Sequence, residues 1–260
     1  MIGGADGPGG TRPVRSRPWA IISRPARVAH SVEQLTRNEQ VAGSIPASGS
    51  SSSESALSYA SLVPAYFGPW DAAQWDLVIA ARPSVVVINP ASGPGDIPHA
   101  GYRDLVGRLD AVGSTVLGYV TTSYLSKPLQ QCRLESESHR NWYGVHGIFW
   151  DEIPAEQARG RVATLRSLRS WSGAGQGVRC VFNPGCQVSR TWFRSLPDSV
   201  FVTFEGPASA YGQRRTIGAL ERQCHLVHTV TEADPVSPPI GLGFAYLTAD
   251  LPPNPWDVFA

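Results

Sequence analysis

The sequence predicts an α/β protein that folds as a compact (β/α)8 barrel, or TIM barrel, behind a disordered N-terminal tail. From residue 57 onward, short runs of β-branched and aromatic residues alternate with helical stretches, a pattern typical of parallel sheets. Eight such runs are present, and eight parallel strands can close on themselves without leaving an edge. A doubly wound open sheet is the alternative, although no G-x-G-x-x-G loop follows any of these runs.

Composition excludes several functional classes. The chain has 260 residues, of which 42% are hydrophobic and 17% charged, so it can bury a sizeable core. A net charge of +1 provides no field that would attract nucleic acid or an anionic membrane surface. No apolar run is long enough for a membrane span, and the four cysteines show no C-x-x-C pairing that would suit zinc. We therefore expect a monomer without metal, cofactor, nucleic-acid partner or membrane span.

Residues 1–56 differ in character from the rest of the chain. They are rich in Gly, Pro and Ser and keep neither helical nor strand periodicity, which predicts a disordered tail. Residues 27–48 also resemble the conceptual translation of a tRNA gene, since Gly43-Ser44-Ile45-Pro46 can be encoded by a T-arm-like sequence. We therefore expect that the start codon was assigned too far upstream and that the barrel covers 57–260. The apolar stretch at 19–22 is too short for a secretory signal, so no localisation is predicted.

The expected strands follow one another at regular spacing. In chain order they are 62–67, 85–88, 115–120, 147–152, 178–182, 200–205, 225–230 and 241–247. Each is a run of β-branched, aromatic or other apolar residues that ends in a polar residue or a turn, as buried parallel strands do.

Helices are expected between most of these strands, at 71–81, 98–111, 129–143, from 154 onward and at 208–222. Pro83 ends the first of them, and Pro154 suits a first helical turn, where its missing N–H costs nothing. Ala158, Val162 and Leu165 begin an amphipathic stripe in the fourth. The weakest connection is 231–239, because its three prolines leave room for one helical turn at most.

Polar and aromatic side chains terminate the predicted strands, at the end where barrels of this class carry their function. These strand-end residues are Tyr66, Asn89, Tyr119, Asp151, Glu152, Asn183, Glu205, His228 and Tyr246. An Asn before Pro is more often a simple turn former. Eight strands that all end in this way nevertheless predict a polar, carboxylate-rich mouth.

Two of the strand-end acids can converge. Asp151 ends the fourth strand and Glu205 the sixth, so at ~4.8 Å per strand their backbones lie roughly 9–10 Å apart. Side chains that lean together can close to about 5–9 Å, which spans the spacings of both retaining and inverting glycosidases. Because strand side chains alternate, Glu152 must reach the mouth from the following loop or bond to the backbone or a neighbouring strand. The competing interpretation is a structural ion pair between each acid and an arginine.

Aromatic residues near the predicted mouth favour a sugar ligand, because an aromatic face stacks on the apolar face of a pyranose. Those available are Tyr66, Trp70, Tyr119, Tyr124, Trp150 and Trp256, and each is equally compatible with the barrel core or a lid. A metal is not expected at His225 and His228, since their spacing directs them to opposite faces of one strand. The turns after the last two strands carry acids, which would repel a phosphate.

Six segments resemble, in order and at fitting spacing, the spherulin-4 family (spherulation-specific family 4): 63–67, 88–95, 118–120, 147–152, 182–185 and 203–207. The resemblance runs from about Leu57 to Asp257. It implies a (β/α)8 barrel related to glycoside hydrolases, whose characterised members cleave α-1,4-linked N-acetylgalactosamine in a microbial galactosaminogalactan exopolysaccharide. The family is typically exported or at the cell surface, and this chain shows no export signal. It also has His146 where the family commonly has an acid, at the base of the strand and away from the mouth.

The resemblance implies that the family's key acids fall on Asp151, Glu152 and Glu205, the acids already chosen from the strand ends. We expect an endo-acting glycoside hydrolase with Glu205 as general acid/base, its pKa raised by the apolar neighbourhood of Phe204, and Asp151 as nucleophile or stabiliser. Glu152 is expected to orient Asp151 or to bond to the substrate. The expected substrate-binding residues are Tyr66, Asn89, Tyr119, Asn183, Trp150 and Tyr246. The alternatives are a non-catalytic carbohydrate-binding or cell-surface barrel, and an inactive paralogue.

Overall fold

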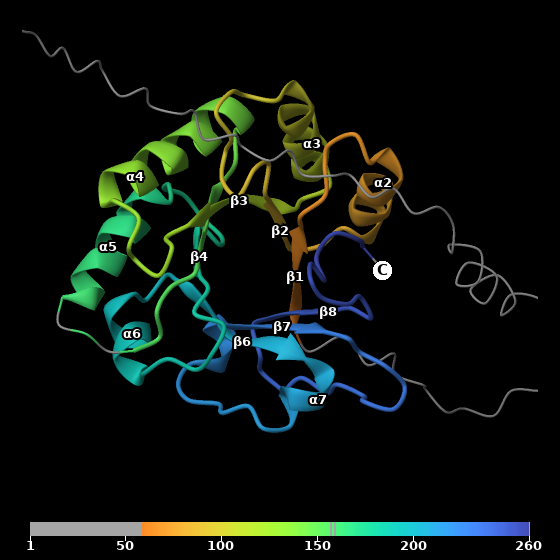
Figure 1. The fold of residues 1–260 in the computed structure, drawn as a ribbon, viewed down its shortest axis with the longest axis vertical. Coiled ribbons are helices and arrows are strands. Elements are labelled where there is room, and N and C mark those ends of the chain that lie inside the picture. Colours follow the sequence, from red (N-terminus) through yellow and green to blue (C-terminus); the bar gives the residue numbers. More distant parts are fainter. Residues whose placement is uncertain (1–58, 157, 159, 260) are drawn as a thin grey trace, which may run out of the picture. The chain divides into compact units, whose positions relative to one another are not determined.

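A computed structural model describes residues 59–156, 158 and 160–259. In this part of the chain the strands form one closed barrel in the order β1 to β8, and every neighbouring pair is parallel (Figure 1). The predicted (β/α)8 class is therefore confirmed, and the doubly wound alternative is wrong. The expectations for residues 1–56 lie outside the described residues, so the tail and the barrel boundary at residue 57 stay predictions.

The strands lie close to their expected positions. Their bounds are β1 Ala60–Ala65, β2 Val85–Ile88, β3 Thr115–Thr121, β4 Gly147–Asp151, β5 Cys180–Phe182, β6 Val200–Pro207, β7 Gln223–His228 and β8 Phe244–Leu247. The barrel closes where β1 pairs with β8, through Ala60 opposite Phe244 and Ser61 opposite Ala245. The strands are almost wholly buried because helices or loops cover their outer faces and their own side chains fill the interior.

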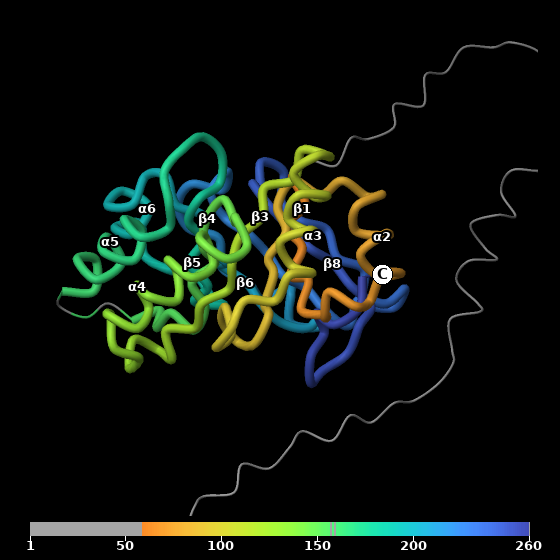
Figure 2. The backbone as a smooth tube through the Cα atoms, turned by 90° about the horizontal axis from the view of Figure 1, so that it is seen from above, coloured from red at the N-terminus to blue at the C-terminus, as the bar shows by residue number. Residues whose placement is uncertain are grey.

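The helices are α2 Ala72–Ala81, α3 Ala100–Ala111, α4 Leu129–Ser138, α5 Arg161–Trp171, α6 Arg190–Ser195 and α7 Ala208–Tyr211, with a π-turn η2 His139–Tyr143 and a 3-10 turn η3 Leu220–Arg222. Figure 2 shows α4, α5 and α6 grouped on one side of the barrel and α2 and α3 on the other. No helix among the described residues is long and apolar enough to cross a membrane.

Two helix predictions are wrong. The helix expected from Pro154 begins at Arg161, because the Ile153 N–H bonds to the Asn183 carbonyl (3.0 Å) and Gly160 has a φ of +82°. The single helix expected over 208–222 is reduced to α7 and η3, and Gly218, with a φ of +95°, interrupts it. The short α6 was not expected. As predicted, 231–239 contains no helix.

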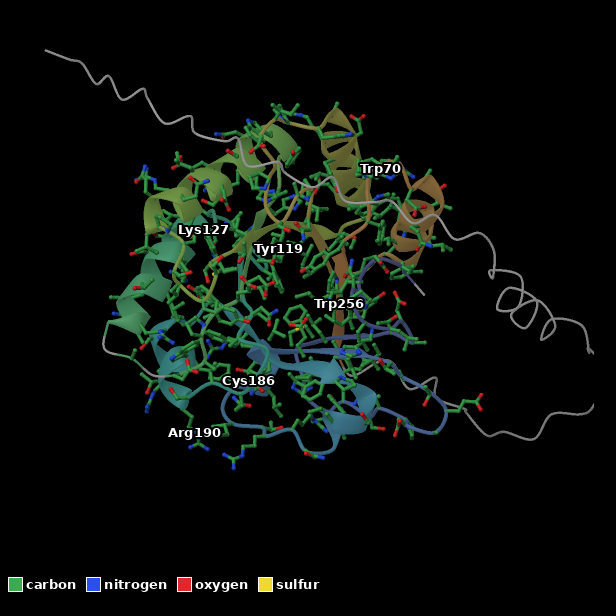
Figure 3. The ribbon with its side chains drawn as sticks, in the orientation of Figure 1. Trp70, Tyr119, Lys127, Cys186, Arg190 and Trp256 are labelled. Atoms are coloured by element: carbon green, nitrogen blue, oxygen red, sulfur yellow. The ribbon has the colours of Figure 1, made fainter. Side chains whose placement is uncertain are left out.

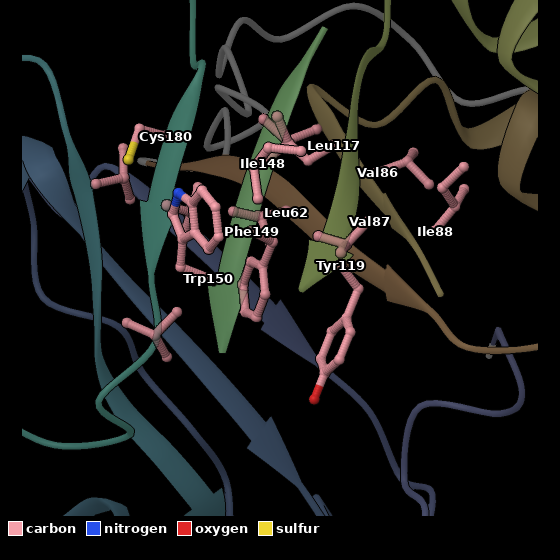
Figure 4. Close-up of a cluster of buried hydrophobic side chains, with 14 of the residues drawn as sticks. Leu62, Val86, Val87, Ile88, Leu117, Tyr119, Ile148, Phe149, Trp150 and Cys180 are labelled. Atoms are coloured by element: carbon pink, nitrogen blue, oxygen red, sulfur yellow. The ribbon is translucent and has the colours of Figure 1, made fainter. Parts of the chain in front are cut away.

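Side-chain alternation separates an inner and an outer face on each strand. Phe149 points into the barrel, where its ring stacks with Tyr119 at 6.3 Å, whereas Trp150 lies on the opposite side of β4 (Figure 4). On β3 the outward residue is Gly118, and a Cβ there would lie 2.4 Å from the His139 ring of η2. The inner face of β3 therefore directs Tyr119 toward the mouth. His146 lies at the base of β4, as expected, where its Nδ1 accepts the Val116 N–H at 2.9 Å.

Candidate active site at the barrel mouth

Asp151 ends β4 on its inner face and is held by three donors. The Tyr119 hydroxyl donates to Oδ2 at 2.6 Å, the Asn183 amide donates to Oδ1 at 2.7 Å, and the Glu152 backbone N–H donates to the same carboxylate. Burial raises the pKa of Asp151, and these donors act in the opposite direction. Asp151 is therefore a desolvated acid whose charged form is nevertheless well supported.

Asn183 joins the two principal acids. Its Nδ2 donates to Asp151 Oδ1 at 2.7 Å and to Glu205 Oε2 at 2.6 Å, so one amide nitrogen bridges β4 and β6. Its Oδ1 accepts the Gly185 backbone N–H at 2.9 Å, which leaves only the amide hydrogens to face the carboxylates. Asn183 is buried, and it fixes the relative position of both acids.

Glu205 reaches the mouth because of an irregularity in β6. The register with β7 shifts between Val202 and Phe204, so Thr203 is an extra residue on the strand. Phe201 and Phe204 consequently both contact outer-layer aromatics, Phe201 those of α6 and Phe204 the Tyr211 ring at 5.0 Å. Without the extra residue, Phe201 and Glu205 would share a face. The bulge therefore directs Glu205 inward, beside the pocket.

Burial is the main cause that raises the pKa of Glu205, and the Asp151 charge raises it further. Hydrogen bonds from the Asn183 amide and the Trp256 side chain lower it. The expected direction of the shift and its apolar surroundings as the cause are thus correct, but Phe204 does not supply those surroundings. Phe204 packs on the other face of β6, away from the Glu205 carboxyl.

Glu152 follows β4 in a left-handed conformation, with a φ of +54°. This backbone turn carries its side chain to β3, where Glu152 Oε2 accepts the Thr121 hydroxyl. Its carbonyl accepts the Tyr124 N–H and the Thr122 hydroxyl, each at 2.9 Å. Of the two arrangements foreseen for Glu152, the structure has the bond to a neighbouring strand. Glu152 supports the end of β4 from beside the pocket and does not line its wall.

A pocket of about 640 Å³ opens over Asp151 and Glu205. Of the expected binding residues, it is lined by Tyr66, Asn89 and Tyr119. Asn183 touches both acids from below without lining the wall. The wall also contains His228 and Trp256, which the sequence had placed near the mouth, and residues that were not selected from it, namely Ser92, Gly206, Pro252, Pro253, Asn254 and Pro255. Figure 3 labels Tyr119 and Trp256, two of the residues that line this pocket.

Two expected binding residues lie elsewhere. Trp150 is fully buried behind β4, and its indole N–H donates to the Ser172 hydroxyl at 2.8 Å. Side chains alternate between the two faces of β4, so Trp150 lies on the outer face, between the strand and the helices. Tyr246 is also buried, stacked on Phe259 at 6.2 Å and tilted against Trp256 at 5.9 Å, and it supports the pocket wall from behind.

The pocket has an acidic and hydroxylic character. Burial is the largest cause that raises the pKa of Tyr66 and Tyr119, followed by the charge of Asp151, so both phenols keep their protons, and Tyr119 donates its proton to Asp151 in a hydrogen bond. In the part of the chain that the structure describes, no arginine or lysine lies within ion-pair distance of Asp151 or Glu205. The structural ion pairs considered from the sequence are thus not what holds these acids.

Asn89 both stabilises a turn and lines the pocket, the two roles that its position at a strand end suggested. Its Oδ1 accepts the Gly93 N–H at 3.2 Å, which stabilises the loop after β2, and its side chain also lines the pocket.

No group of His, Cys, Asp or Glu among the described residues has the arrangement needed to hold a metal ion. His225 faces Tyr211 outside the barrel and His228 faces the pocket, as their spacing predicted.

Comparison with known proteins identifies relatives. The model of spherulation-specific family 4 matches residues 60–238. Spherulin-4 of Physarum polycephalum is 33% identical over 156 residues, which are 57% of this chain and 45% of that protein, so the match spans less than half of the relative's length.

Among solved structures, a mutant O-GlcNAc hydrolase of Thermobaculum terrenum is 12% identical with a TM-score of 0.43, covering 73% of this chain and 55% of that one. A β-mannanase from Streptomyces thermolilacinus is 11% identical with a TM-score of 0.42, covering 78% of this chain and 83% of that one. The family match covers most of the barrel and confirms the resemblance found in the sequence. The chain belongs to spherulation-specific family 4.

Proposed function

We propose that this chain is an endo-acting glycoside hydrolase that cleaves an exopolysaccharide containing galactosamine or N-acetylgalactosamine. The observation that carries the proposal is the pair of buried acids, Asp151 and Glu205, joined by the amide nitrogen of Asn183. Two carboxyl groups on either side of a scissile bond are what most glycosidases use. The choice of amino sugar comes from the family resemblance.

The two acids differ in a way that suits different roles. Asp151 accepts hydrogen bonds from three donors and experiences the charge of Glu152, whereas Glu205 accepts them from two and experiences the charge of Asp151. The additional donor favours the charged form of Asp151 more than that of Glu205. This difference supports Asp151 as nucleophile and Glu205 as general acid, which then acts as base in the second step.

The spacing of the acids favours a double displacement. Asp151 Oδ1 and Glu205 Oε2 both lie within 2.7 Å of one nitrogen, so they are separated by no more than twice that distance. Retaining glycosidases hold their carboxyl groups ~5–5.5 Å apart, whereas inverting ones need ~6.5–9.5 Å to accommodate a water. We therefore propose that Asp151 forms a covalent glycosyl intermediate, which water later hydrolyses.

The pocket walls supply contacts for the sugar. The Tyr66 and Tyr119 rings meet edge to face at 5.5 Å, and the Tyr66, Tyr119 and Asn89 side chains present donors and acceptors to hydroxyl groups. Trp256 adds a further aromatic side chain to the pocket wall. This combination of stacking surface and hydroxyl-binding groups is typical of carbohydrate sites.

Reducing-end release from purified galactosaminogalactan tests the proposal. The full chain should generate new reducing ends, and Asp151→Asn and Glu205→Gln should each lower the rate by at least ~10²–10⁴-fold, because each removes the proton-transferring or nucleophilic group. Glu221→Gln is the matched control, since Glu221 is exposed and lies at the opposite end of the barrel, and its rate should equal the parent's.

Two outcomes would overturn the assignment. Full activity in both Asp151→Asn and Glu205→Gln would place the chemistry elsewhere. Binding of the polymer without any release by the folded parent, unchanged in Asp151→Asn, would instead support the non-catalytic carbohydrate-binding barrel.

A further inference from the structure

Glu205 lines a second pocket in addition to the first pocket, which opens over Asp151. The second pocket has a volume of about 400 Å³ and is bounded by the loop after β5, the end of β6 and the loop after α7. Polar side chains of the two loops line it: Cys186, Gln187, Gln213, Arg214 and Arg215. Glu205 is the one described residue that lines both pockets, whereas Asp151 lines only the first. The proposed general acid therefore lies where the two pockets adjoin.

The loop after β5 packs directly against Glu205. The Glu205 N–H donates to the Gly185 carbonyl at 3.0 Å, and a Cβ on Gly185 would lie 4.0 Å from Glu205 Oε2. Gly185 lines the second pocket in a left-handed conformation, with a φ of +65°. The Glu205 carboxyl thus lies beside the second pocket, and the shared amide nitrogen of Asn183 links it to Asp151 in the first.

This position of Glu205 separates the two sugar units that flank a cleaved bond. In the proposed mechanism Asp151 attacks the anomeric carbon, so the sugar that contains this carbon occupies the first pocket. The glycosidic oxygen takes the Glu205 proton and departs with the next sugar unit. A polysaccharide that crosses Glu205 therefore places the departing unit in the second pocket.

Two arginines give the second pocket a positive character. The Arg214 guanidinium lies 3.9 Å from the centre of the Tyr211 ring, and its Nη1 donates to the Tyr211 carbonyl at 2.9 Å, so its position is fixed. Its Nε is buried and has no hydrogen-bond partner among the described residues. Arg215 is exposed. In the part of the chain that the structure describes, no acid lies within ion-pair distance of either arginine.

The first pocket has the opposite charge, since its described lining contains Asp151 and Glu205 and no arginine or lysine. Only Glu205 of these two acids reaches the second pocket, and it carries a proton when it acts as general acid. Burial and then the charge of Glu156 raise the pKa of the Cys186 thiol, so Glu156 also acts on the second pocket. However, the Glu156 side chain is 83% exposed and lies 3.7 Å from Arg161, so water and this arginine screen its charge. The second pocket therefore favours a negative group.

We propose that the second pocket binds the departing sugar unit and selects one that carries a carboxylate, which Arg214 and Arg215 hold. This inference rests on the proposed hydrolase function and deepens it, because it specifies the charge of the unit on the leaving side of the cleaved bond. A guanidinium binds a carboxylate through charge-assisted hydrogen bonds, whereas it repels the ammonium group of a free galactosamine. A uronic acid is the class of sugar that meets this requirement.

Three oligosaccharides that differ only in the leaving unit test the selection. Each has N-acetylgalactosamine on the donor side, α-1,4-linked to galacturonic acid, to galactose or to galactosamine. We expect kcat/KM to be about tenfold higher with galacturonic acid than with galactose, because charge-assisted hydrogen bonds are stronger than neutral ones. The galactosamine compound should be cleaved most slowly. A galacturonic acid compound that is cleaved no faster than the galactose compound would overturn the proposal.

Arg215→Gln assigns the preference to the pocket. Arg215 is exposed, whereas Arg214 also packs on Tyr211, so Arg215 is the safer residue to replace. The variant should lower the ratio of the galacturonic acid rate to the galactose rate severalfold. Arg133→Gln is the matched control, because it removes the same charge from α4, where Arg133 pairs with Glu137 at 2.9 Å, and its ratio should equal the parent's. A loss of rate that both compounds share equally in Arg215→Gln would contradict the role of Arg215.

Alkylation of Cys186 separates this inference from the proposed function. Cys186 lines the second pocket and is the one exposed cysteine of the four in the chain, so iodoacetamide reports on it. Galacturonic acid should slow the alkylation more than galactose does, and Arg215→Gln should remove this difference. An inactive parent that shows the protection would overturn the hydrolase and keep the acidic-sugar site. An alkylation rate that galacturonic acid leaves unchanged, or that inorganic sulfate lowers equally, would overturn the site even in an active parent.

Discussion

The two halves of the barrel are built differently. The first four strands lead to helices of 10, 12, 10 and 11 residues, α2 to α5. In the second half, α6 has 6 residues, α7 has 4, and no helix follows β7 among the described residues (Figure 1). The barrel still closes, so the second half must cover its strands by other means.

In the second half, polar side chains bond to backbone groups of the connecting segments and of the short helix α6. Arg222 donates to the carbonyls of Phe193, Leu196 and Pro197 at 2.9 to 3.0 Å. Gln187 bonds to both the N–H and the carbonyl of Ile217, each at 3.0 Å. In the first half, the longer helices are fastened to the sheet by buried apolar side chains, such as Leu105 and Leu109 of α3. Irregular chain can thus cover a barrel when its backbone groups have fixed partners.

The candidate site draws on both halves. Asp151 ends a strand of the regular half, and Glu205 ends the bulged strand of the irregular half. The irregular half also contains the extra residue Thr203, which turns Glu205 inward, and the C-terminal wall of the pocket. The regular βα units therefore form the barrel frame. The bulge in β6 and the C-terminal segment determine which side chains face the pocket.

Loss of the Arg222 bonds is the largest stability effect that we expect from this comparison. Arg222→Ala should lower the free energy of unfolding by about 1.5–3 kcal/mol, because charge-assisted bonds to three carbonyls are lost. Arg108→Ala in the regular half is the control, since Arg108 makes only an exposed pair with Asp76 and should cost ~0–1 kcal/mol. Urea unfolding measures both. Equal costs would mean that arginine–carbonyl bonds do not hold the irregular half.

We expect a smaller effect on thermal stability when either acid of the pocket, Glu205 or Asp151, is replaced by its amide. The pKa of Glu205 is raised in the folded state, so the folded state binds the Glu205 proton more tightly than the unfolded chain does. The stability that this proton contributes is lost as the pH rises through the folded-state pKa. Glu205→Gln should therefore raise Tm at pH 7 by a few degrees, and the gain should vanish below the ordinary pKa range of Glu, where both states are protonated. Asp151→Asn should gain less, because three donors already support the Asp151 charge. Thermal melts from pH 3 to pH 8 would show this, and a destabilised Glu205→Gln at pH 7 would contradict it.

Much of the regular frame was predictable. The run at 85–88 is β2, and the expected helix at 98–111 differs from α3 by two residues at one end. Residue alternation also placed Trp150 and Phe149 on opposite faces of β4, and this should have excluded Trp150 from the mouth.

The irregular features left weaker signals in the sequence. The bulge at Thr203 was not visible, because 200–205 reads as one uninterrupted strand and the extra residue depends on pairing with β7. Trp256 was among the aromatics expected near the mouth, but the rest of the wall at 252–256 was not predictable. A Pro-rich stretch has no period, and its place is decided by bonds to Tyr66 and Gln74, far away in the chain. Sequence patterns report local structure, and these features arise from long-range contacts.

The most direct test of the account is the anomeric configuration of the first product. Proton NMR during early turnover of an α-linked galactosamine oligosaccharide distinguishes the two outcomes before mutarotation mixes them. Because Asn183 holds Asp151 and Glu205 close together, the account predicts that the product first appears with the configuration of the substrate. A first product of inverted configuration would contradict it, since a water between the acids needs a wider gap than one shared amide nitrogen permits.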